Sequence, residues 1–333
     1  PAHWSVSKLA EAYITAVRGD DRVRILARLG EVRPRDSNDV RALMNLLSRE
    51  DSSARAKVEA SMALLSPADS ALAPTFLALL EDEDTLAQTL GLVGSARLQV
   101  PKALWPIRKL AEREFPAAQP SLSMSPADAD RWALQFGALK VLAEWEGEKA
   151  RPLVLKVSKE VPAAGEVLAT LFWEKSFDDL VAWSESRQPH DLARAAKAWG
   201  APVPCRSLAP TKARLWSLAL DRRRKVETRR RAVLKLGPCA DEADVDRFLA
   251  ERAKALGKDR ALMDAGLFSS RHPKAIPALL EYAKTSSDPL ARAGAMYQLR
   301  SMLPAADYRA LLQWAAKNDP DPENRNTAAA ELR

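Results

Sequence analysis

Short helical segments recur along this chain at a nearly constant spacing, and this repetition limits the possible folds more than any other feature. Apolar residues return at helical rather than strand spacing in segments such as 58–65 and 291–299, which are rich in Ala, Leu, Arg and Glu. Pro and Asp cluster between these segments, as helix breakers and N-caps do. The pattern therefore predicts an all-α protein.

The helical segments can be aligned on the last large apolar residue of every second helix. The aligned residues lie 28 to 37 residues apart, except for one interval of 49 that contains a Pro- and Ser-rich segment. We expect that segment, at about 115–128, to be an inserted loop. Because one helix pair cannot bury its apolar face alone, the spacing predicts a right-handed α-solenoid of about ten stacked pairs. It would form a single domain over 1–333, with irregular repeats at about 95–205. The aligned residues are Leu29, Leu65, Val93, Leu142, Leu171, Trp199, Leu236, Phe268, Leu299 and Leu332.

Two segments, 288–299 and 321–332, carry a more specific pattern. Each begins with Asp-Pro and has an Arg seven residues before its closing Leu. In this the chain resembles the HEAT-repeat family, specifically the short bacterial HEAT-like (PBS-lyase-type) repeat. The resemblance implies that the Arg side chains pair with turn Asp residues or bond turn carbonyls, forming a ladder along the stack. It implies nothing about function. The matching residues are Arg22, Arg229, Arg292 and Arg325.

Positive charge is concentrated in one part of the chain. The net charge is +7, but the window 205–235 holds eleven basic and two acidic residues. The rest of the chain is therefore slightly acidic, which favours one anion-facing patch over a uniformly basic surface. Basic residues at a helix N-terminus also oppose the helix macrodipole, so their presence there suggests an anionic partner. The alternative is a solvated charged turn in which Arg229 is structural. The expected partner- or anion-binding residues are Arg222, Arg223, Arg224, Lys225, Arg230 and Arg231.

Six of the nine tryptophans fall between residues 105 and 199. Large aromatic side chains there can fill gaps between imperfectly stacked helices. The alternative is an exposed aromatic groove formed by Trp173, Trp183 and Trp199. Some HEAT-like bacterial DNA glycosylases use Trp and Asp beside a basic concave face, and Asp178, Asp179 and Trp183 are similar in composition to such a site.

Both cysteines of the chain follow a proline just past the end of a helix. Cys205 and Cys239 are 34 residues apart, about one repeat. Equivalent positions in stacked helix pairs lie about 10 Å apart, too far for an undistorted disulfide. The two cysteines stand six and three residues beyond their aligned apolar residues, so a disulfide is not excluded. Two buried free thiols are the expected state.

No catalytic signature is present in the sequence. HExxH, GxGxxG, P-loop and GxSxG motifs are absent, and the three histidines fall on different repeats. We expect no enzyme activity, catalytic residue, metal or cofactor. The expected function is a non-enzymatic scaffold or adaptor that binds a protein with an acidic face through the solenoid surface. The alternative is a nucleic-acid-binding HEAT-like protein, with DNA glycosylase-like activity as one form. A cofactor-holding, HEAT-like enzyme accessory is the third hypothesis.

The ends of the chain and its hydropathy give weaker indications. No apolar run reaches about 18 residues, so no transmembrane segment is expected. The chain begins with Pro1 and shows no signal peptide, so a cytoplasmic and an exported, periplasmic location are expected equally. The last helix has no polar capping helix beyond it, so we expect that end to pack on another chain or a missing segment.

Overall fold

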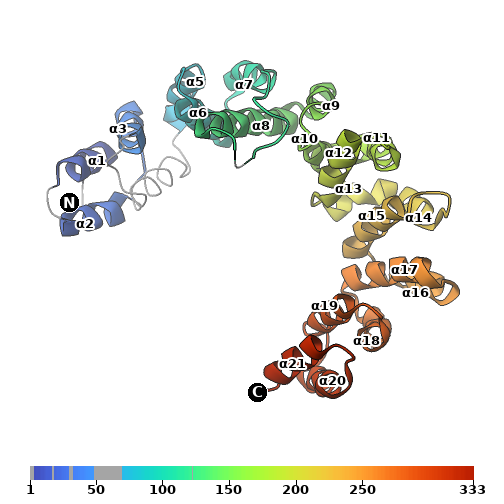
Figure 1. The fold of residues 1–333 in the computed structure, drawn as a ribbon. Coiled ribbons are helices and arrows are strands. Elements are labelled where there is room, and N and C mark those ends of the chain that lie inside the picture. Colours follow the sequence, from blue (N-terminus) through green and yellow to red (C-terminus); the bar gives the residue numbers. More distant parts are fainter. Residues whose placement is uncertain (1–3, 17–18, 30–32, 49–69, 122) are drawn as a thin grey trace. The chain divides into compact units, whose positions relative to one another are not determined.

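The computed structural model describes residues 4–16, 19–29, 33–48, 70–121 and 123–333, and in these ranges it is all-helical, without strands. Helices next to each other in sequence pack together (Figure 1). The chain divides into two compact units, unit 1 (1–167) and unit 2 (168–333). The all-α prediction is confirmed, whereas the single solenoid over 1–333 stays a prediction.

In unit 1 the principal packed pairs are α1 with α2 and α3, α5 with α6, and α7 with α8. The close approach of α5 and α6 requires a glycine, because a Cβ on Gly91 would stand 2.6 Å from the backbone nitrogen of Leu80. The elements are α1 (Val6–Thr15), α2 (Gly19–Leu29), α3 (Ser37–Ser48), η1 (Ser70–Leu72), α5 (Ala73–Leu80), α6 (Thr85–Leu98), η2 (Pro101–Ala103), α7 (Leu104–Ala111), α8 (Pro126–Glu146), η3 (Gly147–Lys149), α9 (Arg151–Ser158) and α10 (Ala164–Leu171), the last of which continues into unit 2.

In unit 2 five successive pairs stack on one another: α11 with α12, α14 with α15, α16 with α17, α18 with α19, and α20 with α21 (Figure 1). We call the first member of each pair the first helix and the other the second helix. The elements are α11 (Trp173–Glu185), α12 (Pro189–Gly200), α13 (Cys205–Leu208), η4 (Ala209–Thr211), α14 (Lys212–Leu220), α15 (Val226–Leu236), η5 (Gly237–Cys239), α16 (Glu242–Lys254), α17 (Gly257–Ser270), η6 (Pro273–Ala275), α18 (Ile276–Thr285), α19 (Pro289–Leu299), α20 (Ala305–Asn318) and α21 (Pro322–Glu331).

The Asp and Pro residues between helices act as the sequence predicts. The side chains of Asp84, Asp288 and Asp321 accept hydrogen bonds from backbone N–H groups in the first turns of α6, α19 and α21. Proline follows immediately at the start of α19 and α21, where the missing N–H has no acceptor to lose. These local signals fix the helix starts.

The four arginines singled out by the repeat pattern each bond a carbonyl at the C-terminal end of the preceding helix or directly after it. Arg22 Nε donates to the Ala16 carbonyl over 3.1 Å, and Arg229 Nε donates to the Ala219 carbonyl over 2.9 Å. Arg292 and Arg325 donate in the same way to the carbonyls of Ser286 and Asp319, each over 2.7 Å. Carbonyls at a helix C-terminus lack intrahelical donors, and these guanidinium groups satisfy them. The predicted bond to turn carbonyls is confirmed.

Two of these arginines also reach the following helix pair. Arg229 Nη1 lies 2.8 Å from a carboxylate oxygen of Asp259 at the start of α17. Arg292 bonds both carboxylate oxygens of Asp319, between α20 and α21, at 3.0 and 2.6 Å. The predicted pairing with Asp therefore occurs between neighbouring pairs at these two positions.

The aligned apolar residues are mostly placed as predicted. Leu29, Leu142, Trp199, Leu236 and Leu299 are buried, whereas Leu171 is 40% exposed. The helices around it, α9 and α10, have only eight residues each and do not form a regular pair. Leu65 lies outside the described residues.

The inserted loop is shorter than predicted. Helix α8 begins at Pro126, so residues 126–128 are helical rather than part of the loop. Two side chains of α8 hold the loop: Trp132 Nε1 donates to the Ala117 carbonyl and Gln135 Nε2 to the Glu114 carbonyl, both over 3.1 Å.

Among the described helices, none is both long enough and apolar enough to cross a membrane.

Candidate functional site

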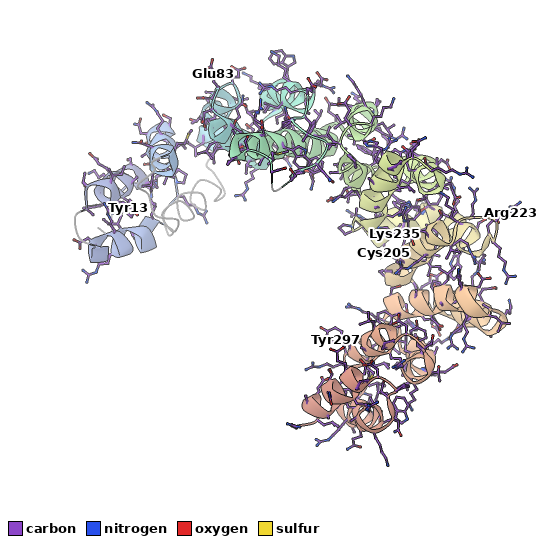
Figure 2. All side chains as sticks on the ribbon, in the orientation of Figure 1. Tyr13, Glu83, Cys205, Arg223, Lys235 and Tyr297 are labelled. Carbon is purple, nitrogen blue, oxygen red and sulfur yellow. A yellow bond between two sulfur atoms is a disulfide. The ribbon has the colours of Figure 1, made fainter. Side chains whose placement is uncertain are left out.

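The predicted basic residues lie in and just after the turn that joins α14 to α15. Arg223 projects from this turn (Figure 2), and its side chain is 91% exposed. Arg222, 74% exposed, pairs with Asp259 over 3.0 Å, while Arg223 and Arg224 pair with Asp221 over 2.9 and 3.6 Å. Hydrogen bonds from the side chain and backbone of Arg223 lower the pKa of Asp221. The turn thus partly neutralises its own charge.

Two of the predicted binding residues have structural contacts instead. The Arg231 side chain is 15% exposed, donates to Ser184 Oγ on α11 over 3.1 Å and pairs with Glu227 over 3.2 Å, so its role as an anion-binding residue stays a prediction. Lys225 donates to the Ser186 carbonyl over 2.8 Å. Both side chains connect α15 with the preceding pair. Arg230 remains 58% exposed and pairs weakly with Glu227 over 3.8 Å.

A net positive charge remains after this pairing. The segment 222–231 holds seven basic side chains, and their acidic partners are Asp221, Glu227 and Asp259. No side chain caps the N-terminus of α15. Lys225 is exposed as well but bonds the preceding pair, so we call the other exposed members, Arg222, Arg223, Arg224 and Arg230, the basic turn.

A row of exposed aliphatic side chains follows the starts of the second helices in unit 2. These side chains stand within the first four residues of α12, α15 and α19 or directly before α17, at intervals of 34, 30 and 34 residues. Their exposed fractions are 37%, 45%, 83% and 81% in chain order. Among the described residues of unit 2, the first helices expose no large apolar side chain. We call this row, which passes the basic turn, the aliphatic edge: Leu192, Val226, Leu256 and Leu290.

The tryptophans predicted to form an exposed groove are buried. Trp173, Trp183 and Trp199 are 2%, 9% and 6% exposed, so the aromatic-groove prediction is wrong. Trp173 and Trp199 pack edge to face with their ring centroids 5.4 Å apart. Their indole N–H groups donate to Thr211 Oγ1 and to the Leu180 carbonyl, over 2.6 and 3.2 Å. The gap-filling role is the one observed.

Two of the residues compared with DNA glycosylases, Trp183 and Asp178, lie in different environments. Trp183 is buried beneath Arg194, whose guanidinium carbon lies 4.4 Å from the ring centroid. The Asp178 side chain is 86% exposed and pairs with Arg214 on the protein surface.

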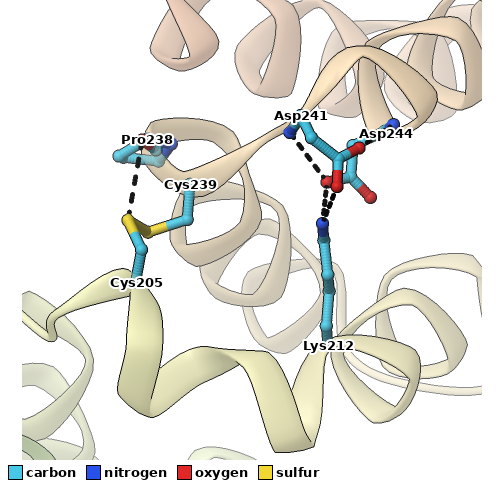
Figure 3. The surroundings of a disulfide bond; sticks show 6 residues. All are labelled: Cys205, Lys212, Pro238, Cys239, Asp241 and Asp244. Carbon is cyan, nitrogen blue, oxygen red and sulfur yellow. Dashed lines mark hydrogen bonds and ion pairs between the residues drawn. A yellow bond between two sulfur atoms is a disulfide. The ribbon is translucent and has the colours of Figure 1, made fainter.

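Cys205 and Cys239 form a disulfide (Figure 3), so the expectation of two free thiols is wrong. Cys205 opens α13 and Cys239 ends η5, and these two short elements pack together. Because the cysteines occupy different positions in their repeats, their Cα atoms are 5.3 Å apart instead of one full repeat spacing.

The disulfide forms one wall of a cavity of about 140 Å³. Leu208, Leu215 and Leu236 supply its apolar lining, and two lysines, Lys212 and Lys235, supply its charge. We call it the two-lysine cavity. Cys205 and Ala209 are exposed, so this side of the cavity faces solvent.

Lys212 is held by carboxylates. Its ammonium contacts Asp241, 2.7 Å away, and Asp244 (Figure 3). Burial lowers the pKa of Lys212, but the hydrogen bonds to these two carboxylates outweigh burial and raise the pKa overall. Asp244 also accepts a hydrogen bond from Trp216 Nε1 over 2.9 Å. This network fixes Lys212 in its charged form.

Lys235 is placed very differently. It is 9% exposed, it donates to the Ala201 carbonyl at the end of α12, and its ammonium lies 5.7 Å from the centroid of the Trp173 ring. Among the described residues no carboxylate forms an ion pair with it. Burial lowers the pKa of Lys235 to about 8. A buried lysine without a counter-charge reduces stability whenever it is protonated.

Replacing this lysine is therefore expected to stabilise the protein. Lys235→Met should raise the free energy of unfolding at pH 7 by about 1–2 kcal/mol, since it removes the cost of a buried charge and loses one hydrogen bond. Between pH 8 and 10.5 the unfolded wild type holds a proton that the folded state has released. Wild-type stability therefore rises with pH in this window, and the advantage of Lys235→Met should shrink there. Urea unfolding at pH 7 and pH 10 measures both effects.

The matched control is Lys212→Met in the same cavity. It should destabilise the protein by about 1–3 kcal/mol, because it leaves the buried Asp244 without its cation. Equal effects of the two substitutions would contradict the assignment of opposite environments.

Sequence reasoning missed both the aliphatic edge and Lys235. Lys235 stands three residues after Ala232 and seven after Thr228, both buried, so helical periodicity places it on the buried face of α15. The sequence therefore contained the periodicity that indicates burial, but Lys235 was counted only as one of the basic residues in the window 205–235.

Within the described part of the chain, no group of three or more His, Cys, Asp or Glu side chains is arranged to hold a metal ion.

Comparisons with known proteins add little. No protein-family model matches this sequence, and no curated protein matches it. Among solved structures, the chain is similar to an engineered protein at 15% identity, over 98% of this chain and 97% of that one, with a TM-score of 0.31.

Proposed function

We propose that this protein is a non-enzymatic scaffold whose unit 2 binds a partner protein along the aliphatic edge and the basic turn. The partner segment would combine acidic side chains with apolar ones. The observation that carries this proposal is the recurrence of an exposed aliphatic side chain at the start of four successive second helices. The architecture would be a HEAT-like α-solenoid, in keeping with the helix pairs and the arginine bonds to turn carbonyls.

Two properties of this surface support binding to a protein. Packing a partner's apolar side chains against an exposed aliphatic row removes both surfaces from water, which is favourable, and such patches mark interaction sites. The neighbouring basic turn adds attraction and specificity for an acidic segment. The excess positive charge occupies one inter-helix turn, whereas a duplex nucleic acid presents phosphates over a longer path. A protein segment therefore fits this surface better.

Two variants test the two parts of the surface separately. Arg223→Glu/Arg230→Glu reverses the most exposed charges that have weak or local partners, and Leu256→Asp/Leu290→Asp removes the most exposed aliphatic side chains. Each bait is used in a nuclease-treated pull-down from lysate of the source organism, quantified by mass spectrometry. We expect a common set of proteins whose recovery falls at least roughly tenfold with either variant.

The control variant is Arg309→Glu/Lys317→Glu, which makes the same charge change on exposed residues of the first helix α20. It should recover the same proteins as the wild type. If all baits recover the same proteins, the aliphatic edge and basic turn are not the binding surface. Retention of nucleic acid alone would favour the nucleic-acid hypothesis.

A further inference from the structure

The two-lysine cavity places one reactive amine among apolar side chains. Among the described residues the amine of Lys235 donates to one acceptor, the Ala201 carbonyl, and the Lys235 side chain helps to line a space walled by three leucines and the disulfide. Among described residues, the carboxylates bonded at this cavity, Asp241 and Asp244, contact the other lysine. Lys235 is therefore the group in this cavity that can lose its proton near neutral pH and retain a free lone pair.

We propose that Lys235 is a nucleophilic amine that captures small apolar aldehydes or ketones in the two-lysine cavity as an imine. The nitrogen lone pair attacks the carbonyl carbon, the carbonyl π electrons move to oxygen, and one proton passes from nitrogen to that oxygen. The resulting carbinolamine loses its hydroxyl group and the remaining N–H proton as one water molecule, and a C=N bond replaces C=O. No oxidant or reductant is needed, and hydrolysis reverses the reaction.

The cavity limits the size of the carbonyl compound. Its volume of about 140 Å³ is close to that of an engineered, leucine-lined protein cavity that accepts benzene. Aldehydes from about three carbons up to the size of benzaldehyde should therefore fit. Entry is from the side of Cys205 and Ala209, both of which are exposed.

The test compares the lysines of the intact wild-type protein under reductive trapping. Propanal and sodium cyanoborohydride are added at pH 7, and propylation of each lysine is followed over time by peptide mass spectrometry. At pH 7 the neutral fraction of an amine with a pKa of about 8 is roughly three hundred times that of one near 10.5. Because access to the cavity is restricted, we expect Lys235 to react at least about tenfold faster than Lys212 and the exposed Lys258. Equal or slower reaction at Lys235 would overturn the proposal.

Two further measurements separate capture in the cavity from general reactivity. Benzyl alcohol, which cannot form an imine, should occupy the cavity and slow labelling of Lys235 while leaving Lys258 unchanged. If it does not protect Lys235, the amine reacts outside the cavity and the proposal is wrong. Lys235→Met, checked for folding by circular dichroism, should lose the fast-reacting site and keep the slow rates at Lys212 and Lys258.

Discussion

Replacing Arg292 by alanine is expected to destabilise unit 2 by about 3–5 kcal/mol, because it leaves a buried carboxylate without its cation. The side chains of Arg292 and Asp319 are 3% and 0% exposed. Burial raises the pKa of Asp319, but the hydrogen bonds from Arg292 and from the backbone of Asp321 outweigh burial and lower it overall. Urea unfolding followed by hydrogen exchange of peptides from α18–α21 measures the change where it should occur.

The equivalent arginine of the next pair provides the control. Arg325 also bonds turn carbonyls, those of Asp319 and Pro320, but no described carboxylate forms an ion pair with it. Arg325→Ala should therefore cost only about 1 kcal/mol. The paired change Arg292→Met/Asp319→Asn should cost much less than Arg292→Ala, because neither partner is left charged and buried. Similar losses for Arg292→Ala and Arg325→Ala would show that the ion pair contributes little.

The pH dependence gives this prediction a definite sign. In the wild type the pKa of Asp319 is lowered on folding, so its contribution to stability is present above about pH 4 and is lost as the pH falls further. In Arg292→Ala the carboxylate is buried without a cation, so its pKa should be raised instead. The difference in stability between variant and wild type should therefore be largest near pH 7 and shrink toward pH 4.

Features of this fold that depend on neighbours in sequence could be predicted, and features that depend on distant neighbours could not. The N-caps Asp288 and Asp321 and the arginine bonds to turn carbonyls are local, since each partner lies within one helix and one turn. The partner of Arg292 in the next pair, Asp319, is 27 residues away, and its identity follows from how the pairs stack.

In the candidate sites, too, local features could be predicted from the sequence and features that depend on distant residues could not. The basic turn was found because charge is visible in sequence, but the burial of Arg231 depends on Ser184, 47 residues away. The burial of Trp173 and Trp199 likewise depends on contacts between helix pairs. Lys235 differs from the other basic residues of its window only in the face of α15 that it occupies. Its neighbours in sequence do not show that no carboxylate pairs with its ammonium in the fold.

Removing the disulfide by Cys205→Ser/Cys239→Ser is expected to destabilise unit 2 by about 3–4 kcal/mol. The bond closes a loop across 34 residues, and its loss returns the corresponding conformational entropy to the unfolded chain. Urea unfolding of the oxidised wild type, the reduced wild type and the double variant measures this cost. Dithiothreitol should lower the wild-type midpoint to about that of the variant and leave the variant unchanged.

Because of its location, loss of the disulfide should also loosen the local packing of the folded state, in addition to raising the entropy of the unfolded chain. The bond joins α13, which η4 separates from α14, to η5, directly after α15, so it forms part of the solvent-facing wall of the two-lysine cavity. Hydrogen exchange should therefore increase first in peptides covering α13 and η5 when the bond is reduced, ahead of α18–α21. A wild-type midpoint that does not respond to reduction, with no change in exchange at α13, would show that packing alone holds these two elements together.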